Sequence, residues 1–228
     1  MKKAYCTIIT YDYLCYALAL NSSLLAFDHS VQFKILIADK EVDAEVLQSK
    51  YPNVQVFNIH QLCTQGVARV ISDRYAKANV DCFRWSMKPV FIKHLLKLGF
   101  DQVFFLDPDI FFFSPFDFLS DDLRGNSVLL TPHWRSSAPE KDEVNFAILQ
   151  TSGLFNAGFV GVSSSGIDAM DWWAHVCAYK CEKNPEQGLF VDQAYLDLLP
   201  IYFDKIAIER NRGCNVANWN QVECKRVA

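Results

Sequence analysis

The sequence predicts a single α/β domain with a mainly parallel central sheet flanked by helices. Short apolar runs rich in branched and aromatic residues alternate with longer helical segments, as in β-α-β units. The 228 residues are 51% hydrophobic, which is enough to bury one substantial core. No internal repeat, low-complexity tract or linker divides the chain, so we expect one domain over residues 1–228.

The first part of the chain reads as strand, helix, strand, helix and strand, which implies parallel strands joined by right-handed crossovers. Asp12 is the expected N-cap of the first helix. After this unit we expect a helix and a mobile loop over residues 58–81. The expected strands are residues 4–10, 32–38 and 54–57, and the expected helices are residues 14–27 and 41–50.

The second part begins with one long helix, expected over residues 83–98 with Gly99 as its C-terminal cap. Residues 114–123 are expected to form a loop and residues 135–143 a flexible polar segment. The other expected elements are strands at 103–106, 128–130 and 206–208, a turn leading into a strand over 153–162, helices at 167–181 and 189–199, and a turn with a short strand at 213–216.

Two carboxylates interrupt the apolar run V-F-F-L-D-P-D-I-F-F-F at residues 103–113. Pro108 cannot donate to a sheet ladder, which marks either the end of a buried strand or an edge of the sheet. Side chains two apart in a strand share a face, so we expect Asp107 and Asp109 to lie side by side. Ligands of open α/β folds bind at this end of the strands, and hard oxygen ligands select Mg²⁺ or Mn²⁺. The alternative is that one aspartate caps a turn and the other is solvated.

Composition excludes several classes of protein. The net charge of −4 leaves no basic footprint for nucleic acid, and an acidic chain that binds an anionic substrate needs a cation at its site. The eight cysteines contain no C-x-x-C pair, so we expect free thiols in a reducing compartment and no zinc site at Cys177 and Cys181. No apolar run reaches the roughly 18 residues of a membrane span, and the N-terminus lacks signal-peptide features. We expect a cytoplasmic protein, with peripheral attachment at the inner face of the membrane left open.

Three motifs follow one another in a fixed order: D-P-D at 107–109, F-N-A-G at 155–158 and D-Q at 192–193. With L-T-P-H and N-V-A-N-W-N, this set resembles the metal-dependent glycosyltransferases of the GT-A fold and is similar to a bacterial branch of the retaining glycosyltransferase family 8. The resemblance runs from Ala4 to about Asn220. It implies a GT-A-like (Rossmann-like) domain that moves a sugar from a nucleoside-diphosphate sugar, with UDP-sugar the expected donor, to an acceptor hydroxyl with retention. The implied cofactor is Mn²⁺ or Mg²⁺.

The resemblance also implies roles for single residues. Asp107 and Asp109 would hold the metal on the donor diphosphate, and Asp192 and Gln193 would be the catalytic pair beside the transferred sugar. As the N-terminal residue of an expected helix, Asp192 would stay ionised. The implied donor-binding residues are Thr10, Tyr11, Lys88 and Asn156, with Arg84 as the second candidate for the role of Lys88.

Each of these residues also has an ordinary structural interpretation. Tyr11 suits the rim of the core, Lys88 a solvated helix face, Asn156 a turn and Asp192 the dipole of its own helix. The ordered set of motifs favours the functional interpretation.

One departure concerns the third metal ligand, which the family takes from a late histidine. No histidine follows Asp192, so the chain is truncated, another ligand completes the metal, or binding is weak. His133, at an expected strand end, is a further candidate for which a local structural role is favoured. Two other functions stay open: a haloacid-dehalogenase-like phosphohydrolase, and a non-catalytic sugar-nucleotide-binding or scaffold protein.

Overall fold

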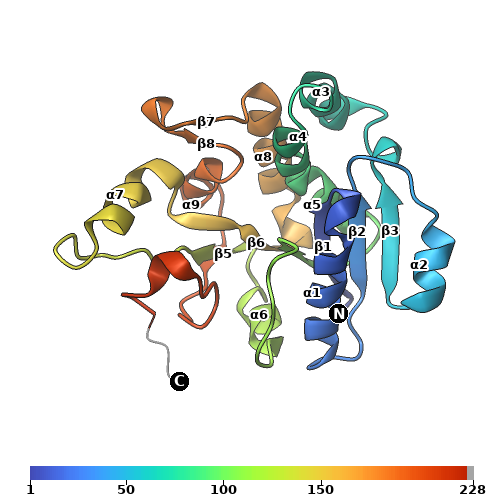
Figure 1. Cartoon of the computed structure of the whole chain (residues 1–228), viewed down its shortest axis with the longest axis horizontal. Coiled ribbons are helices and arrows are strands. Elements are labelled where there is room, and N and C mark those ends of the chain that lie inside the picture. The colour runs from blue at the N-terminus through green and yellow to red at the C-terminus, as the bar shows by residue number, and fades with distance from the viewer. Residues whose placement is uncertain (225–228) are drawn as a thin grey trace.

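A seven-stranded sheet forms the centre of the computed structural model, which describes residues 1–224 (Figure 1). Its strand order is β3-β2-β1-β4-β6-β5-β9. Neighbouring strands are parallel except for β6, which runs antiparallel to β4 and to β5. The mainly parallel sheet is therefore confirmed. The strands are β1 Lys3–Ile9, β2 Phe33–Ile37, β3 Val54–Asn58, β4 Gln102–Leu106, β5 Val128–Pro132, β6 Phe155–Ser163 and β9 Ile206–Ile208.

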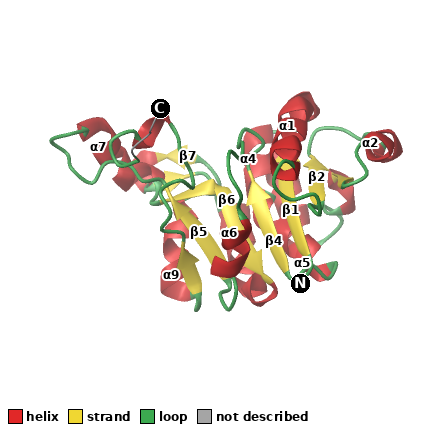
Figure 2. Ribbon diagram, turned by 90° about the horizontal axis from the view of Figure 1, so that it is seen from below, coloured by secondary structure: helices red, strands yellow, loops and turns green. Residues whose placement is uncertain are grey.

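Helices cover both faces of this sheet (Figure 2). The strand β4 is fully buried and sends alternate side chains to the two sides. Val103 and Phe105 pack in the core with α5 and α8, whereas Phe104 and Leu106 pack in the core with α1 and α6. The helices are α1 Leu14–Leu25, α2 Ala44–Lys50, α3 Gly66–Tyr75, α4 Val80–Ser86, α5 Lys88–Lys97, α6 Asp117–Asp122, α7 Glu143–Ser152, α8 Ile167–Tyr179 and α9 Leu199–Tyr202.

Two predictions about helix ends were wrong. The helix expected over 83–98 is divided at Met87, because Pro89 in the first turn of α5 has no N–H to continue the α4 ladder. Asp12 does not cap α1; it lies within a short 3₁₀ helix, Tyr11–Tyr13, that precedes α1. Gly99 ends α5 as predicted, with a φ of 88° that favours glycine.

Other local predictions were also wrong. The expected loop 114–123 contains α6, and residues 213–216 form a turn without a strand. In the segment expected to be flexible, Ser137 is bonded to Glu223, and α7, which was not predicted, follows it. The expected helix 189–199 is instead strand β8 (Leu189–Phe190), a turn, a 3₁₀ helix (Ala194–Leu198) and the start of α9, with β8 pairing to β7 (Lys183–Asn184).

Free thiols are found, as predicted, at Cys6, Cys15, Cys63, Cys82, Cys177, Cys181 and Cys214. Within residues 1–224, no helix combines the length and the apolar character needed to cross a bilayer.

Candidate functional site

Lys88 joins the two motifs that contain aspartate. It is the first residue of α5, only 3% of it is exposed, and its Nζ lies 5.0 Å from the centre of the Phe105 ring in β4. Its Nζ lies 3.4 Å from Asp107 Oδ1 and 3.3 Å from Asp192 Oδ2, and it donates a hydrogen bond of 3.0 Å to the Ala157 carbonyl. The alternative of a solvated helix face is therefore excluded for this lysine. One buried ammonium group holds two carboxylates that are 85 residues apart in the chain.

Burial and charge act against each other in this cluster. Burial alone would lower the pKa of Lys88, but Asp107 and Asp192 outweigh it, so the pKa of Lys88 is raised. Burial raises the pKa of Asp192 to about 6, and the Lys88 charge opposes this shift only in part. Asp192 Oδ2 accepts no hydrogen bond from the described residues, although it is paired with Lys88. The pKa of this buried carboxyl therefore lies above that of an ordinary aspartate.

Asp192 reaches Lys88 through a turn and not through a helix. Val191 has a φ of 47°, unusual for a β-branched residue, and its N–H is bonded to the Glu182 carbonyl. Trp173 Nε1 donates to the Asp192 carbonyl at 2.9 Å. The prediction that Asp192 begins a helix whose dipole keeps it ionised was wrong: Asp192 lies in a turn ahead of the 3₁₀ helix Ala194–Leu198, and desolvation is the largest cause of its pKa shift.

The D-P-D segment leaves the sheet in a tight turn. The strand β4 ends at Leu106, and the Ile110 N–H bonds back to the Asp107 carbonyl. Asp107 is half-buried beside Lys88, while Asp109 is exposed. Strand alternation does not govern this pair, since neither aspartate lies in a strand. Their arrangement side by side stays a prediction.

Asn156 and Asp107 lie against the same glycine of β6. A Cβ on Gly158 would come within 2.9 Å of Asp107 Oδ2 and 3.0 Å of Asn156 Oδ1. The Gly158 carbonyl accepts from the Asp107 N–H at 2.7 Å, and its own N–H donates to Asn156 Oδ1 at 2.8 Å. Only glycine at this position leaves the Asp107 and Asn156 side chains where they are.

Gln193 and His133 form hydrogen bonds with backbone groups around the site. Gln193 Oε1 accepts from the Ala157 N–H at 3.2 Å, and its Nε2 donates to the Ser152 carbonyl at 2.7 Å. His133 is 3% exposed, and its Nδ1 lies 3.1 Å from the Gly153 carbonyl. Burial lowers the pKa of His133 to about 4, so the ring is neutral at pH 7. These contacts favour a local structural role for His133.

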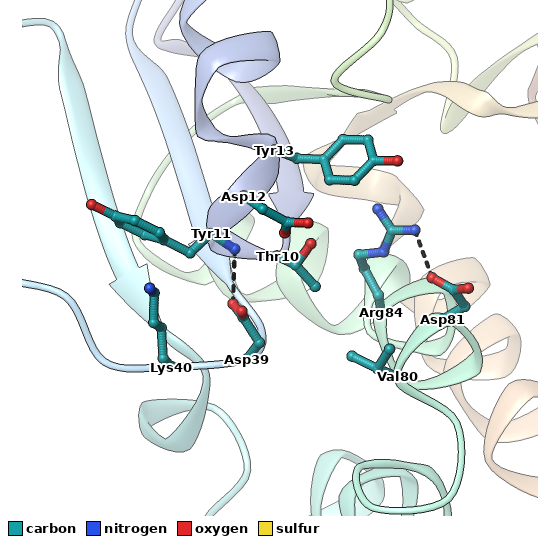
Figure 3. A pocket seen from close by; sticks show the side chains of 9 residues that line it. All are labelled: Thr10, Tyr11, Asp12, Tyr13, Asp39, Lys40, Val80, Asp81 and Arg84. Atoms are coloured by element: carbon teal, nitrogen blue, oxygen red, sulfur yellow. Dashed lines mark hydrogen bonds and ion pairs between the residues drawn. The ribbon is translucent and has the colours of Figure 1, made fainter.

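A separate cavity of about 530 Å³ opens where β1 meets α1 (Figure 3). Asp39 Oδ1 accepts from the Tyr11 N–H at 2.9 Å, and Lys40 Nζ lies 3.6 Å from the centre of the Tyr11 ring. Tyr11 and Tyr13 point to opposite sides, with Tyr13 toward Arg84. The residues lining the cavity are Thr10, Tyr11, Asp12, Tyr13, Asp39, Lys40, Val80, Asp81 and Arg84.

The cavity contains the predicted residues Thr10 and Tyr11, whereas Lys88 and Asn156 belong to the carboxylate cluster. Sequence reasoning missed Tyr13 and Asp39 as lining residues. The end of the second expected strand at residue 38 was the available signal for Asp39, since the carboxyl ends of parallel neighbours lie together.

Asp107 and Asp109 suit a Mg²⁺ or Mn²⁺ site better than a structural zinc site. Within residues 1–224, no three side chains of His, Cys, Asp or Glu are grouped to hold a metal by themselves. This does not fit a structural zinc site, which needs four protein ligands. Asp107 and Asp109 do fit Mg²⁺ or Mn²⁺, which take one or two carboxylates and complete their shell with phosphate oxygens and water. Three aspartates against one lysine also leave excess negative charge in this region.

Comparison with known proteins identifies the fold. No family profile matches the chain. Two curated relatives come from Bacillus subtilis (strain 168), and both are uncharacterized proteins. YfnF is 26% identical over 230 residues, and the match covers 96% of this chain and 73% of YfnF. YfnD is 23% identical over 220 residues, and the match covers 94% of this chain and 68% of YfnD.

Solved glycosyltransferases superpose on most of the chain. The galactosyltransferase LgtC, solved with donor and acceptor sugar analogues, has a TM-score of 0.55 at 15% identity over 92% of this chain and 74% of its own. This chain has the fold of a glycosyltransferase. Mouse xyloside xylosyltransferase 1 has a TM-score of 0.54 at 11% identity, and the match covers 92% of this chain and 84% of the mouse protein. The bifunctional glycosyltransferase WbbM has a TM-score of 0.56 at 15% identity, and the match covers 92% of this chain but only 39% of WbbM. The GT-A-like fold is thus confirmed, and membership of family 8 stays a prediction.

Proposed function

We propose that this protein is a metal-dependent glycosyltransferase that moves a sugar from a nucleoside-diphosphate sugar to an acceptor hydroxyl. The observation that carries the proposal is the cluster in which Lys88 contacts both Asp107 and Asp192 at the carboxyl end of β4. The cluster joins two of the three motifs, and Gly158 brings the third against Asp107. The solved structures that share this fold are described as glycosyltransferases, which supports sugar transfer in preference to phosphate hydrolysis. UDP-sugars are the donors to test first, and retention of configuration is part of the proposal.

The cavity beside β1 is the proposed nucleoside site. It offers aromatic rings for a base, together with carboxylate and cationic groups that can hydrogen-bond to polar atoms of the nucleoside. Tyr11, with Lys40 Nζ 3.6 Å from its ring centre, is the proposed residue to stack on a base, and Tyr13, which points toward Arg84, is the second aromatic candidate. The diphosphate would then extend from this cavity toward the D-P-D turn.

Asp107 and Asp109 would hold Mn²⁺ or Mg²⁺ together with the donor phosphates. The chemistry that such an ion supplies is stabilisation of the negative charge on the leaving diphosphate. Lys88 supplies a fixed positive charge beside Asp107, and Asp192 keeps that ammonium group in place. Asn156, next to Asp107, is the proposed ligand of donor-sugar hydroxyls.

Asp192 stays the proposed catalytic carboxylate, and Gln193 the residue that fixes its surroundings. The Gln193 amide binds backbone at both ends, which suits positioning better than direct attack. Asp192→Asn should therefore bind UDP and metal nearly as well as wild type but turn over donor far more slowly. If the variant loses UDP affinity and keeps turnover at saturating donor, Asp192 has been assigned the wrong role.

This proposal can be tested by measuring the melting temperature of the protein with a panel of nucleotide sugars, with and without Mn²⁺. A ligand that binds only the native protein must raise its melting temperature. We expect a larger shift with Mn²⁺ for wild type, no metal-dependent gain for Asp109→Ala, and a normal gain for Asp117→Ala, which removes another exposed aspartate on α6. Phosphate release from a monoester without any nucleotide-sugar shift would favour the phosphohydrolase. Shifts without donor turnover would favour the binding protein.

A further inference from the structure

Asn215 reaches the site from the turn that follows β9. It lies 59 residues after Asn156 in the chain and has a left-handed backbone with a φ of 68°. Asparagine tolerates this conformation better than most residues, because its short side chain can bond to nearby backbone. None of the roles proposed above includes this residue.

The Asn215 side chain joins β5 to β6. Its Oδ1 accepts from Asn156 Nδ2 at 2.7 Å, and its Nδ2 donates to the Pro132 carbonyl at 2.9 Å. At its other end, Asn156 Oδ1 accepts from the Gly158 N–H at 2.8 Å. The Asn156 amide is therefore held at both ends and cannot flip without losing both bonds. These two bonds use half of its capacity, since an amide has two N–H groups and two acceptor lone pairs.

The amide that Asn215 holds borders the metal carboxylate. Asn156 Oδ1 and Asp107 Oδ2 lie 3.0 Å and 2.9 Å, respectively, from a Cβ built at Gly158, so the two oxygens border the same small space. A donor with its diphosphate at Asp107 would bring its sugar close to Asn156, because the sugar is attached to the terminal phosphate. The orientation of this amide then determines whether it meets a hydroxyl group with a donor or with an acceptor.

We infer that Asn215 is a positioning residue that fixes Asn156 for recognition of the donor sugar. The inference rests on the proposed function, since it requires a nucleotide sugar in the site. Asn215 acts on the sugar and not on the nucleotide, because it does not line the cavity beside β1. One well-oriented hydrogen bond is worth up to about tenfold in affinity, which sets the expected loss.

Asn215→Gly tests the side chain without disturbing the backbone, because glycine adopts a positive φ freely. The matched control is Lys205→Gly, at another positive φ of 58° on the exposed surface. Calorimetry with Mn²⁺ would compare UDP with UDP-glucose and UDP-galactose. We expect Asn215→Gly to bind UDP within about twofold of wild type and to bind the accepted UDP-sugar about tenfold more weakly. Lys205→Gly should match wild type for both ligands.

A double-mutant cycle with Asn156→Ala separates positioning from general damage. If Asn215 acts through Asn156, Asn215→Gly should weaken sugar binding no further in the Asn156→Ala background. Equal losses for UDP and UDP-sugar, additive losses in the cycle, or no loss at all would each overturn the inference. A wild-type protein that binds none of these ligands would instead refute the proposed function, and this outcome is visible before any variant is made.

Discussion

Gly158→Ala is the substitution that tests the geometry of the carboxylate site most selectively. The glycine lies in β6, and its φ is outside the left-handed region, so alanine meets no backbone strain. The new methyl group would come within 2.9 Å of Asp107 Oδ2 and 3.0 Å of Asn156 Oδ1. Both oxygens belong to residues proposed to hold the donor, and neither is part of the apolar core.

The size of the effect follows from these distances. Ordinary contact begins at 3.4 Å, so the Asp107 oxygen must move by about 0.5 Å. Metal sites tolerate deviations of about 0.2 Å in ligand distance, so the movement is large for binding. Stability should change by less than about 1 kcal/mol, because alanine also lowers the entropy of the unfolded chain. We therefore expect Mn²⁺-dependent UDP binding to weaken by at least about tenfold in a protein that unfolds almost normally.

Calorimetry and denaturant unfolding measure the two effects separately, and Gly161→Ala is the matched control. A Cβ at Gly161 would lie 3.0 Å from the Phe104 ring and 3.2 Å from Leu129, both in the core. This variant should lose stability and keep its affinity in the folded state, the reverse of Gly158→Ala. Normal Mn²⁺–UDP affinity in Gly158→Ala would show that Asp107 and Asn156 do not form the binding site.

Two further predictions concern the buried charges. Lys88→Met leaves the Asp192 carboxylate buried without its cation and should destabilise the fold by about 3–5 kcal/mol. The double variant Lys88→Met/Asp192→Asn should recover a large part of this loss. If both variants are equally unstable in urea unfolding, the result would argue against this ion pair. Because burial raises the pKa of Asp192 from 3.8 to about 6, the folded state keeps a proton that the unfolded chain has lost. The stability of wild type relative to Asp192→Asn should therefore fall as the pH rises from about 4 to about 6 and then level off. A flat or rising difference in urea unfolding across this range would contradict the assignment.

Local sequence patterns predicted where strand β4 ends and the D-P-D segment begins. The apolar run of β4 and the proline after Asp107 place the end of a buried strand, and the structure has that strand ending at Leu106. Periodicity could not decide whether Lys88 is solvated or buried. The answer depends on the break at Met87 and on Asp192, a residue that is far away in the sequence.

Long-range contacts account for what local patterns missed. The sequence around Asp192 is apolar and suits a helix, but Val191 adopts a left-handed conformation that the Glu182 carbonyl and the β7–β8 pairing support. Asn215 meets Asn156 because β9 runs parallel to β5, which brings the turn after β9 to the carboxyl end of β5. Such contacts have no signature within a window of neighbouring residues.

Release of UDP from a UDP-sugar is the measurement that tests the central proposal most directly. Wild type should release UDP from at least one UDP-sugar when Mn²⁺ or Mg²⁺ is present, with faster release once an acceptor hydroxyl is supplied. Removal of the metal with a chelator, or the substitution Asp107→Ala, should abolish that release while the fold persists. Release that is unaffected by the chelator and by Asp107→Ala would contradict the account.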